Sequence, residues 1–194
     1  SQLVAPFMKV EPGLRVVDAC AGAGGKTLHI ASLMKNKGKV IAMDIEDWKL
    51  QELKKRLRRN GVDIVETRLI DSNKVIKRME SAADRVLLDV PCSGMGVLRR
   101  NPDSKWKLTE ARLRELQELQ REILVQYSSM VKKDGYLIYA TCSLLPSENR
   151  EQINWFLENS NQTQARWQFE EDVALFPHRD RFDGFYMARL KRLS

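Results

Sequence analysis

Two cysteines lie where apolar runs of the sequence end. Cys92 follows "RVLLDV" (Arg85–Val90), and Cys142 stands in "IYATCSLLPSEN" behind a second apolar run. A thiolate is a strong nucleophile, although most isolated cysteines in reduced proteins are inert core residues. Ligands of open α/β sheets bind at the carboxyl ends of the strands, so two adjacent strand ends would bring both thiols to one crevice.

Three carboxylates follow expected strands in the same way. Asp44, Asp71 and Asp89 each stand at the end of a separate apolar run. A solvated strand cap explains any one of them alone. Because the carboxyl ends of parallel strands meet at one edge of a sheet, the three together favour a ligand site lined by acidic groups.

A glycine-rich turn precedes them in "VVDACAGAGGKTLHIA" (Val16–Ala31). Strand, turn and helix start form a nucleotide-binding crossover, in which free backbone N–H groups face the ligand. One interpretation is the phosphate-binding loop of an NTPase or kinase, because "GKT" matches the end of G-x-x-x-x-G-K-[ST]. That pattern needs a glycine where Cys20 stands. The other interpretation is an adenosine-containing cofactor whose ribose binds an acid about 20 positions on, which Asp44 supplies.

The acidic groups narrow the choice of cofactor. "GAGGKT" lacks the G-x-G-x-x-G spacing of dinucleotide sites, and several carboxylates would repel a pyrophosphate. A cofactor with a cationic sulfonium and an ammonium group would gain from them, which indicates S-adenosylmethionine. The C5 carbon of a pyrimidine becomes a good nucleophile only after another group adds at C6. A thiol, a carboxylate and a methyl donor are therefore the set that pyrimidine C5 methylation needs.

The expected elements alternate between strands and helices, which predicts a parallel, doubly wound α/β sheet in one domain. Two more strands near the end of the sequence predict an antiparallel hairpin at one sheet edge. The strands are expected at 14–19, 39–44, 63–71, 85–90, 135–143, 165–171 and 183–193, and the helices at 26–35, 47–60, 109–131 and 147–158.

The composition is that of a globular protein. The 194 residues are 43% hydrophobic, and no apolar run approaches the roughly 18 residues of a membrane span. Lys and Arg number 33 against 26 Asp and Glu, and the net charge of +7 favours a polyanionic partner. Three cysteines without a CxxC pair and two separated histidines indicate neither a disulfide framework nor a metal site. We expect a reduced, cytoplasmic and monomeric protein.

Four motifs carry a resemblance to a known family. "DACAGAGGKT", "DVPCSGMG", "ATCSLLPSEN" and "FPHRDRFDGFYMARL" together resemble the NOL/NOP/Sun family of RNA 5-methylcytosine methyltransferases, over nearly the whole chain. The pairing of "PCSG" with "TCS" is specific, because cytosine-C5 DNA methyltransferases have only the first of these cysteines. One position departs from the family: Ala23 stands where its first loop has proline, with Gly24, Gly25 and Lys26 in register.

The resemblance implies a fold and an organisation. The expected fold is a Rossmann-like class I methyltransferase, with a mostly parallel seven-stranded sheet, an antiparallel last strand and helices on both faces. Residues 1–194 would form a single catalytic domain cut from a longer chain that carries an N-terminal RNA-binding region. The implied cofactor is S-adenosylmethionine, and the implied partner is RNA, either rRNA or tRNA, without a metal or a membrane.

The resemblance also implies roles for single residues. Cys142 would attack C6 of the target cytosine, and Cys92 would assist removal of the C5 proton and release of the enzyme. Asp89 would hydrogen-bond the cytosine edge. The cofactor would be held by Cys20, Ala21, Gly22, Ala23, Gly24, Gly25, Lys26, Asp44, Asp71 and Asp89.

Two alternatives stay open at this point. A phosphate-loop NTPase or kinase would explain "GKT" but neither cysteine, and a non-catalytic, basic RNA-binding module would not need "TCS". We expect the basic row "KKRLRR" (Lys54–Arg59) to be a solvated helix face. Arg99, Arg100 and Lys105, near the mouth of the crevice, are the better candidates for contacts with RNA phosphates.

Overall fold

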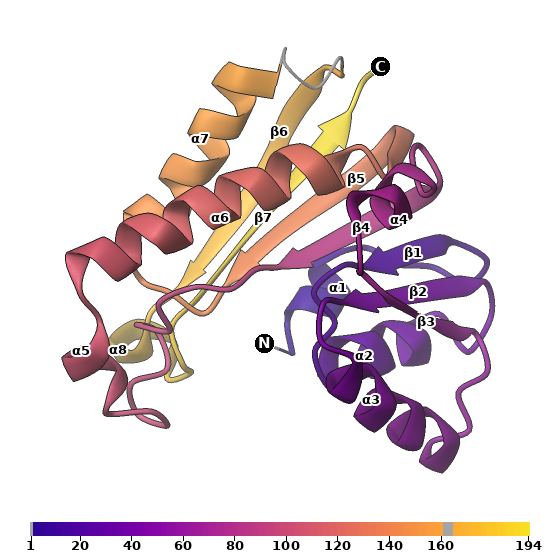
Figure 1. The fold of residues 1–194 in the computed structure, drawn as a ribbon, viewed down its shortest axis with the longest axis horizontal. Helices are drawn as coiled ribbons and strands as arrows, with labels where there is room; N and C mark the ends of the chain where they lie inside the picture. Colours follow the sequence, from indigo (N-terminus) through magenta and orange to yellow (C-terminus); the bar gives the residue numbers. More distant parts are fainter. Residues whose placement is uncertain (1, 161–164) are drawn as a thin grey trace.

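The computed structural model describes residues 2–160 and 165–194, and its centre is a twisted sheet (Figure 1). Within the described residues the sheet has seven strands in the order β3-β2-β1-β4-β5-β7-β6. The strands β1 to β5 run parallel to one another, and β7 runs against both of its neighbours. The strands are β1 (Arg15–Asp18), β2 (Lys39–Asp44), β3 (Val65–Leu69), β4 (Ala83–Asp89), β5 (Val131–Thr141), β6 (Trp167–Leu175) and β7 (Phe185–Arg192).

This architecture confirms the expected fold, including the hairpin of β6 and β7 at one edge. Two strands extend four residues beyond one of their predicted ends. β5 already begins at Val131, where the long helix was expected to end, and its register against β4 shifts where Asp134 takes a positive φ of 62°. β6 continues to Leu175, in a segment expected to be a loop, because β7 pairs with it as far as Phe185.

The four long helices lie close to their expected positions. The helix expected at 147–158 is divided, because Asn149 has a non-helical backbone conformation between a 3-10 turn and α7. Four helices of only four or five residues were not predicted, since a single turn shows no hydrophobic period. The helices are α1 (Val4–Phe7), α2 (Gly25–Leu33), α3 (Asp47–Arg59), α4 (Asn73–Lys77), α5 (Ser104–Lys107), α6 (Glu110–Ser128), η1 (Pro146–Glu148), α7 (Arg150–Asn159) and α8 (Pro177–Asp180).

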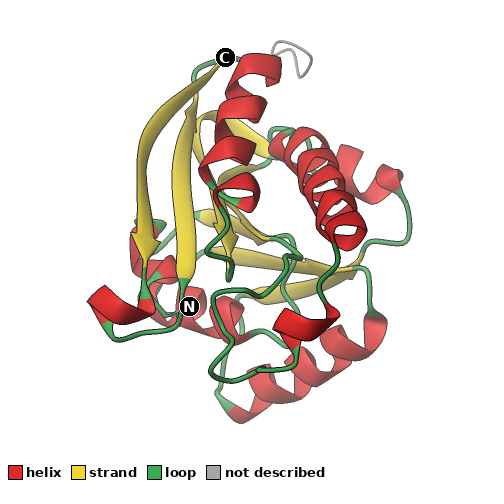
Figure 2. Cartoon of the chain, turned by 90° about the vertical axis from the view of Figure 1, so that its left-hand side faces the viewer, coloured by secondary structure: helices red, strands yellow, loops and turns green. Residues whose placement is uncertain are grey.

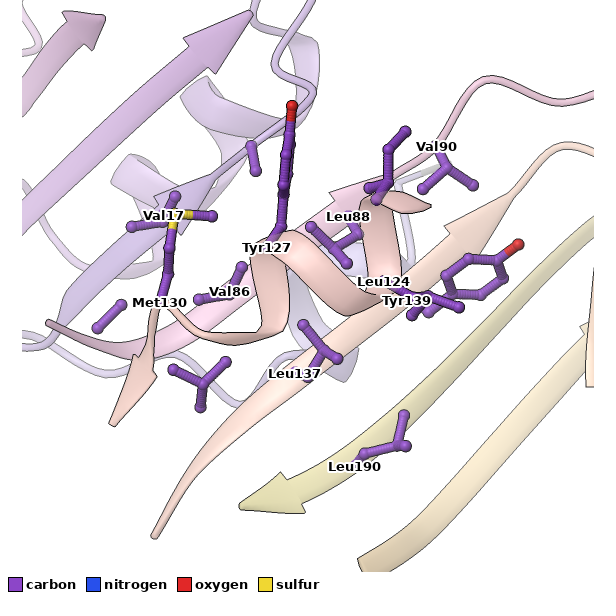
Figure 3. Packing of buried hydrophobic residues seen from close by; sticks show 14 of the residues in the cluster. Val17, Val86, Leu88, Val90, Leu124, Tyr127, Met130, Leu137, Tyr139 and Leu190 are labelled. Atoms are coloured by element: carbon purple, nitrogen blue, oxygen red, sulfur yellow. The ribbon is translucent and has the colours of Figure 1, made fainter. Parts of the chain in front are cut away.

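Successive residues of each central strand face opposite sides of the sheet, and both sides are apolar. On one side, Val86 and Leu88 of β4 pack beneath Leu124 and Tyr127 of α6, as Figure 3 shows. On the other side, Leu87 belongs to a second cluster that includes residues of α1 and α2. A third cluster joins α3 to β2. The buried strands are therefore covered by helices on both faces, which holds their ends in fixed positions.

The carboxyl ends of the five parallel strands lie on the same side of the sheet. The loops that follow these ends carry the predicted site residues. The loop after β4 leads to α5 at the left of Figure 1, the side that faces the viewer in Figure 2. Two backbone hydrogen bonds tie this loop to its neighbours: Gly96 donates to the Cys142 carbonyl at 2.8 Å, and Gly184 donates to the Gly96 carbonyl at 2.7 Å. A Cβ on Gly96 or Gly184 would collide with the facing chain, so the three loops are packed backbone to backbone.

Candidate active site

The two thiols expected at adjacent strand ends lie side by side. β4 and β5 are parallel neighbours with Asp89 opposite Ala140, so the chain leaves both strands at the same level. The Sγ atoms of Cys92 and Cys142 are 3.3 Å apart, at hydrogen-bonding distance for sulfur. Both side chains are partly buried, and all three cysteines of the chain are free thiols.

The surroundings shift the pKa values of these two thiols in opposite directions. The hydrogen bond from Cys92 lowers the pKa of Cys142; burial and Asp89 oppose this shift, and the Lys26 ammonium group favours it. The same hydrogen bond raises the pKa of Cys92, and burial and the Glu148 carboxylate raise it further. Cys142 is therefore the preferred thiolate and Cys92 the preferred holder of the proton.

A buried carboxylate holds the loop that carries Cys92. Glu148 is fully buried and accepts hydrogen bonds from the Ser93 backbone N–H at 2.8 Å and from the Ser93 hydroxyl at 2.5 Å. The Gln120 side chain of α6 donates to the same carboxylate at 3.1 Å and to the Pro91 carbonyl at 2.9 Å. From the sequence, Glu148 was expected only as part of the helix at 147–158. Its position in "PSEN", shortly after "TCS", was the available signal.

A second set of polar contacts holds the turn that carries Cys142. The Thr141 hydroxyl donates to the Asn149 side-chain carbonyl at 2.5 Å, and the Asn149 amide donates to the Ser143 carbonyl at 3.0 Å. The Tyr139 hydroxyl donates to the Glu148 carbonyl at 2.7 Å. The side chains of Thr141, Asn149 and Tyr139 are all buried, so these hydrogen bonds are shielded from water and fix the position of the turn.

A cavity of about 560 Å³ lies at the carboxyl end of β1. Lys26 and Asp89 form an ion pair in its wall, and both influence the pKa of Cys142, so they connect the cavity to the thiols. Its lining residues are Gln2, Ala5, Asp18, Cys20, Ala21, Gly25, Lys26, His29 and Asp89.

The glycine-rich loop forms the start of α2, as the sequence predicted. Gly24 precedes the helix with a φ of 86°, and a Cβ there would collide with Leu53 of α3, so glycine meets both requirements. The Gly22 backbone N–H donates to the Asp44 carboxylate at 2.9 Å, and the Glu46 N–H donates to its other oxygen at 2.9 Å. Asp44 thus ties the glycine loop to the end of β2.

The predicted cofactor residues fall into three groups. Cys20, Ala21, Gly25, Lys26 and Asp89 line the cavity. Gly22, Ala23 and Gly24 complete the loop, and Asp44 supports it, without lining the cavity. Asp71 is exposed, accepts a hydrogen bond from Ser72 and does not line the cavity; the N–H of the preceding Ile70 donates to the Asp44 backbone carbonyl at 2.9 Å.

Asp18 is a cavity residue that the sequence analysis missed. It is fully buried and accepts a hydrogen bond from the Thr27 hydroxyl at 2.7 Å, while its other oxygen has no partner among the described residues. Burial raises the pKa of Asp18 to about 6; the Thr27 hydrogen bond opposes the shift, and the Asp89 carboxylate adds to it. Asp18 ends the run "RVVD", so it carries the strand-end signal that identified the other carboxylates.

The acidic, histidine and cysteine side chains and the helices of the described residues bear on two other kinds of site. No group of three or more His, Cys, Asp or Glu side chains among them is arranged to hold a metal ion. In the same part of the chain, no helix has both the length and the apolar composition needed to cross a bilayer.

Sequence comparison matches the chain to one family. The model of the 16S rRNA methyltransferase RsmB/F family matches residues 5–191. The chain is 38% identical to the probable ribosomal RNA small subunit methyltransferase B of Synechocystis sp. and 35% identical to that of Bacillus subtilis. Each alignment covers 99% of this chain and 46% of the relative, so the chain spans about half the length of the curated relatives it matches.

Solved structures agree with this match. The crystal structure of NSun6 from Pyrococcus horikoshii with SFG has a TM-score of 0.88 at 26% identity, covering 100% of this chain and 51% of that one. A methyltransferase homolog protein from the same organism has a TM-score of 0.84 at 28% identity, covering 99% of this chain and 66% of that one. These neighbours confirm the class I methyltransferase fold. The motifs, the strand order and the family match lead to one conclusion: the chain belongs to the RsmB/F family, the NOL/NOP/Sun relatives that the sequence motifs indicated.

Proposed function

We propose that this chain is the catalytic domain of an RNA (cytosine-C5-)-methyltransferase that uses S-adenosylmethionine and acts on ribosomal RNA through a covalent intermediate. The observation that carries the proposal is the pair of thiols 3.3 Å apart, one with a lowered and one with a raised pKa. Methyl transfer to an oxygen or an exocyclic nitrogen needs no such pair. Methyl transfer to C5 needs both a nucleophile at C6 and a group that helps to remove a proton from C5.

The residues of the larger cavity fit S-adenosylmethionine. Asp18 and Asp89 are carboxylates that would attract its sulfonium and ammonium groups, and one buried oxygen of Asp18 still lacks a hydrogen-bond donor. The start of α2 at Gly25 offers free backbone N–H groups. The acidic wall and the Lys26–Asp89 ion pair do not favour the phosphate-loop alternative, because that loop needs its lysine free for phosphate. When bound, S-adenosylmethionine supplies the methyl group.

Cys142 acts first in this mechanism. Its thiolate attacks C6 of the cytosine, an S–C6 bond forms, and the electrons of the C5–C6 double bond move onto the ring. Asp89 is placed to hydrogen-bond the cytosine edge and to support a proton on N3 while the adduct exists. The Lys26 ammonium group stabilises the anionic forms of both Asp89 and Cys142. The negative charge gives C5 the nucleophilic character that it lacks in the free base.

Cys92 acts in the second half. After C5 has received the methyl group, its proton must leave before the S–C6 bond can break. The sulfur of Cys92 lies 3.3 Å from the attacking sulfur. Once Cys142 is bonded to carbon, the Cys92 thiol gives its own proton to solvent, and the resulting thiolate accepts the proton from C5. Elimination then restores the C5–C6 double bond and the Cys142 thiolate. The target base must leave its stack to reach the thiols, as for other enzymes that act on a base.

The relatives support ribosomal RNA as the substrate class, because those from Synechocystis sp. and Bacillus subtilis carry names of small subunit rRNA methyltransferases. To test the proposal, the purified protein is incubated with methyl-labelled S-adenosylmethionine and unmodified small-subunit rRNA, and the RNA is digested to nucleosides. The expected product is labelled 5-methylcytidine, identified by mass spectrometry. Label in another nucleoside would contradict the C5 assignment, and label in none would contradict the activity.

A further inference from the structure

A second cavity, of about 340 Å³, lies next to the one assigned to the cofactor, and both are lined by Gln2. No step of the proposed mechanism uses this second cavity. It lies between the start of the chain, the segment that follows the Cys92 loop, and the loop between α8 and β7. Its lining residues are Gln2, Leu3, Arg100, Leu175, Phe182 and Asp183.

The walls of the second cavity are attached to the thiol site. Arg100 follows Gly96 in one loop, and Phe182 precedes Gly184 in the other. Gly184 donates to the Gly96 carbonyl, and Gly96 donates to the carbonyl of Cys142. The Arg100 guanidinium also pairs with Asp183 at 2.8 Å, which joins the two loops a second time. A group bound in this cavity would therefore lie next to a base held at the thiols.

The chemistry of the walls suits a nucleotide. The Phe182 side chain is 64% exposed and belongs to none of the hydrophobic clusters of the described residues, so core packing does not explain it. Arg100 is 76% exposed, and its bond to Asp183 uses only the Nε group, which leaves the outer nitrogens available. Arg99 and Arg181 stand beside these residues and form no ion pair with any described residue. An exposed ring next to unpaired cations is the combination that binds single-stranded nucleic acid.

We propose that the second cavity binds a nucleotide adjacent to the target cytosine in a single-stranded RNA segment. Its base stacks on the Phe182 ring, and its phosphate is held by Arg100, which Asp183 keeps in position. This inference rests on the proposed function, because it adds a binding site for the same RNA. It also supplies a way to hold the strand while the target base is turned into the thiol site.

The test measures binding of a fluorescently labelled single-stranded RNA of about twelve nucleotides with one cytosine, a length within the known site sizes of such proteins. Phe182→Leu keeps an apolar side chain but removes the aromatic face, and we expect its affinity for the RNA to fall about five- to hundredfold. Phe182→Trp keeps the face and should bind within about twofold of the wild type. Calorimetry with S-adenosylmethionine should give the same affinity for all three proteins, which shows that the fold is intact.

Trp106→Leu is the matched control. Trp106 is 80% exposed on α5, in the same segment as Arg100, but it lines neither of the two cavities. Its replacement should change RNA affinity less than Phe182→Leu does. A larger loss for Trp106→Leu would move the stacking site from the second cavity to α5 and overturn the inference.

An abasic scan identifies the stacked nucleotide. RNAs that lack one base at successive positions beside the cytosine are titrated with wild type and Phe182→Leu. At one position the two proteins should bind equally, because the ring then has no base to stack on. If Phe182→Leu binds and methylates the intact RNA like the wild type, the inference is wrong while the proposed function stands. If the wild type neither binds RNA nor forms 5-methylcytidine, both are wrong.

Discussion

Cys20 and Cys142 both follow strands at the same edge of the sheet, yet their surroundings act on the thiol in opposite directions. Burial raises the pKa of Cys20, and the carboxylates of Asp18, Asp89 and Asp44 raise it further. The hydrogen bond from Cys92 lowers the pKa of Cys142, and the Lys26 ammonium group contributes to the lowering. Position at a strand end is therefore not enough to make a nucleophile, because the nearby charges and hydrogen bonds decide which thiol ionises.

The two regions also differ in how they are held. The thiol region is fixed from behind by buried side chains, of which Glu148 and Asn149 make several hydrogen bonds each. The glycine loop of the cofactor region is fixed by its own backbone and by Asp44. A covalent step needs its reacting sulfur held to within about 0.5 Å of the productive position. A loop that binds a cofactor must instead leave its backbone N–H groups open to the ligand.

The largest expected effect separates Cys142 from Cys20. Cys142→Ala removes the nucleophile, and we expect the rate of 5-methylcytidine formation to fall by about 10⁴-fold or more, as for other nucleophile deletions. Cys20→Ala should lose far less, and the loss should appear in KM for S-adenosylmethionine. Steady-state kinetics measure both quantities. Comparable losses in kcat for the two variants would contradict the comparison.

Glu148→Ala tests the support behind Cys92. The change leaves the Ser93 hydroxyl, the Ser93 N–H and the Gln120 amide without their buried acceptor, at a cost of about 3 kcal/mol in the free energy of unfolding. Urea unfolding measures the loss, and the exposed Glu118 of α6 provides the control variant Glu118→Ala. We also expect kcat, normalised to the concentration of folded protein from titration with S-adenosylmethionine, to fall while KM for S-adenosylmethionine is unchanged; a loss of stability alone would leave this normalised kcat unchanged.

Asp18 should make the free energy of unfolding depend on pH. Its folded pKa of about 6 lies above the usual 3.8, so between these values the folded state binds more protons than the unfolded state. The free energy of unfolding should therefore decrease as pH rises from about 4 to 6, by roughly 3 kcal/mol from this group. Asp18→Asn cannot titrate, so urea unfolding at several pH values should show a flatter profile for this variant. An unchanged slope would mean that Asp18 is not the titrating group.

The smallest effect concerns Asp44 and Asp71, the two carboxylates that were expected to bind the cofactor. Asp44→Ala removes an acceptor for charge-assisted hydrogen bonds and should weaken S-adenosylmethionine binding about ten- to hundredfold. Asp71→Ala should weaken it much less, because Asp71 is exposed, whereas Asp44 is buried and accepts a hydrogen bond from the glycine loop. Calorimetric titration measures both affinities. Equal losses would show that Asp71 reaches the cofactor when it binds.

The sheet could be predicted from the sequence because each central strand is a short apolar run with a turn signal behind it. The glycine loop and the thiol pair could be located for the same reason, since parallel strands place their ends together. The role of Glu148 could not, because its partners Ser93 and Gln120 come from distant segments. Asp71 was expected at the same ligand site; it follows β3, the edge strand beside β2, and does not line the cavity.

The central claim is that Cys142 attacks and Cys92 releases, and trapping of the adduct tests it most directly. Cys92→Ala, Cys142→Ala and the double variant are incubated with substrate RNA and S-adenosylmethionine and then separated by denaturing electrophoresis. The account predicts a covalent protein–RNA species with Cys92→Ala alone, because that variant attacks and methylates but cannot readily eliminate. A covalent species with Cys142→Ala would reverse the two roles, and a folded Cys92→Ala without any trapped RNA would contradict the claim.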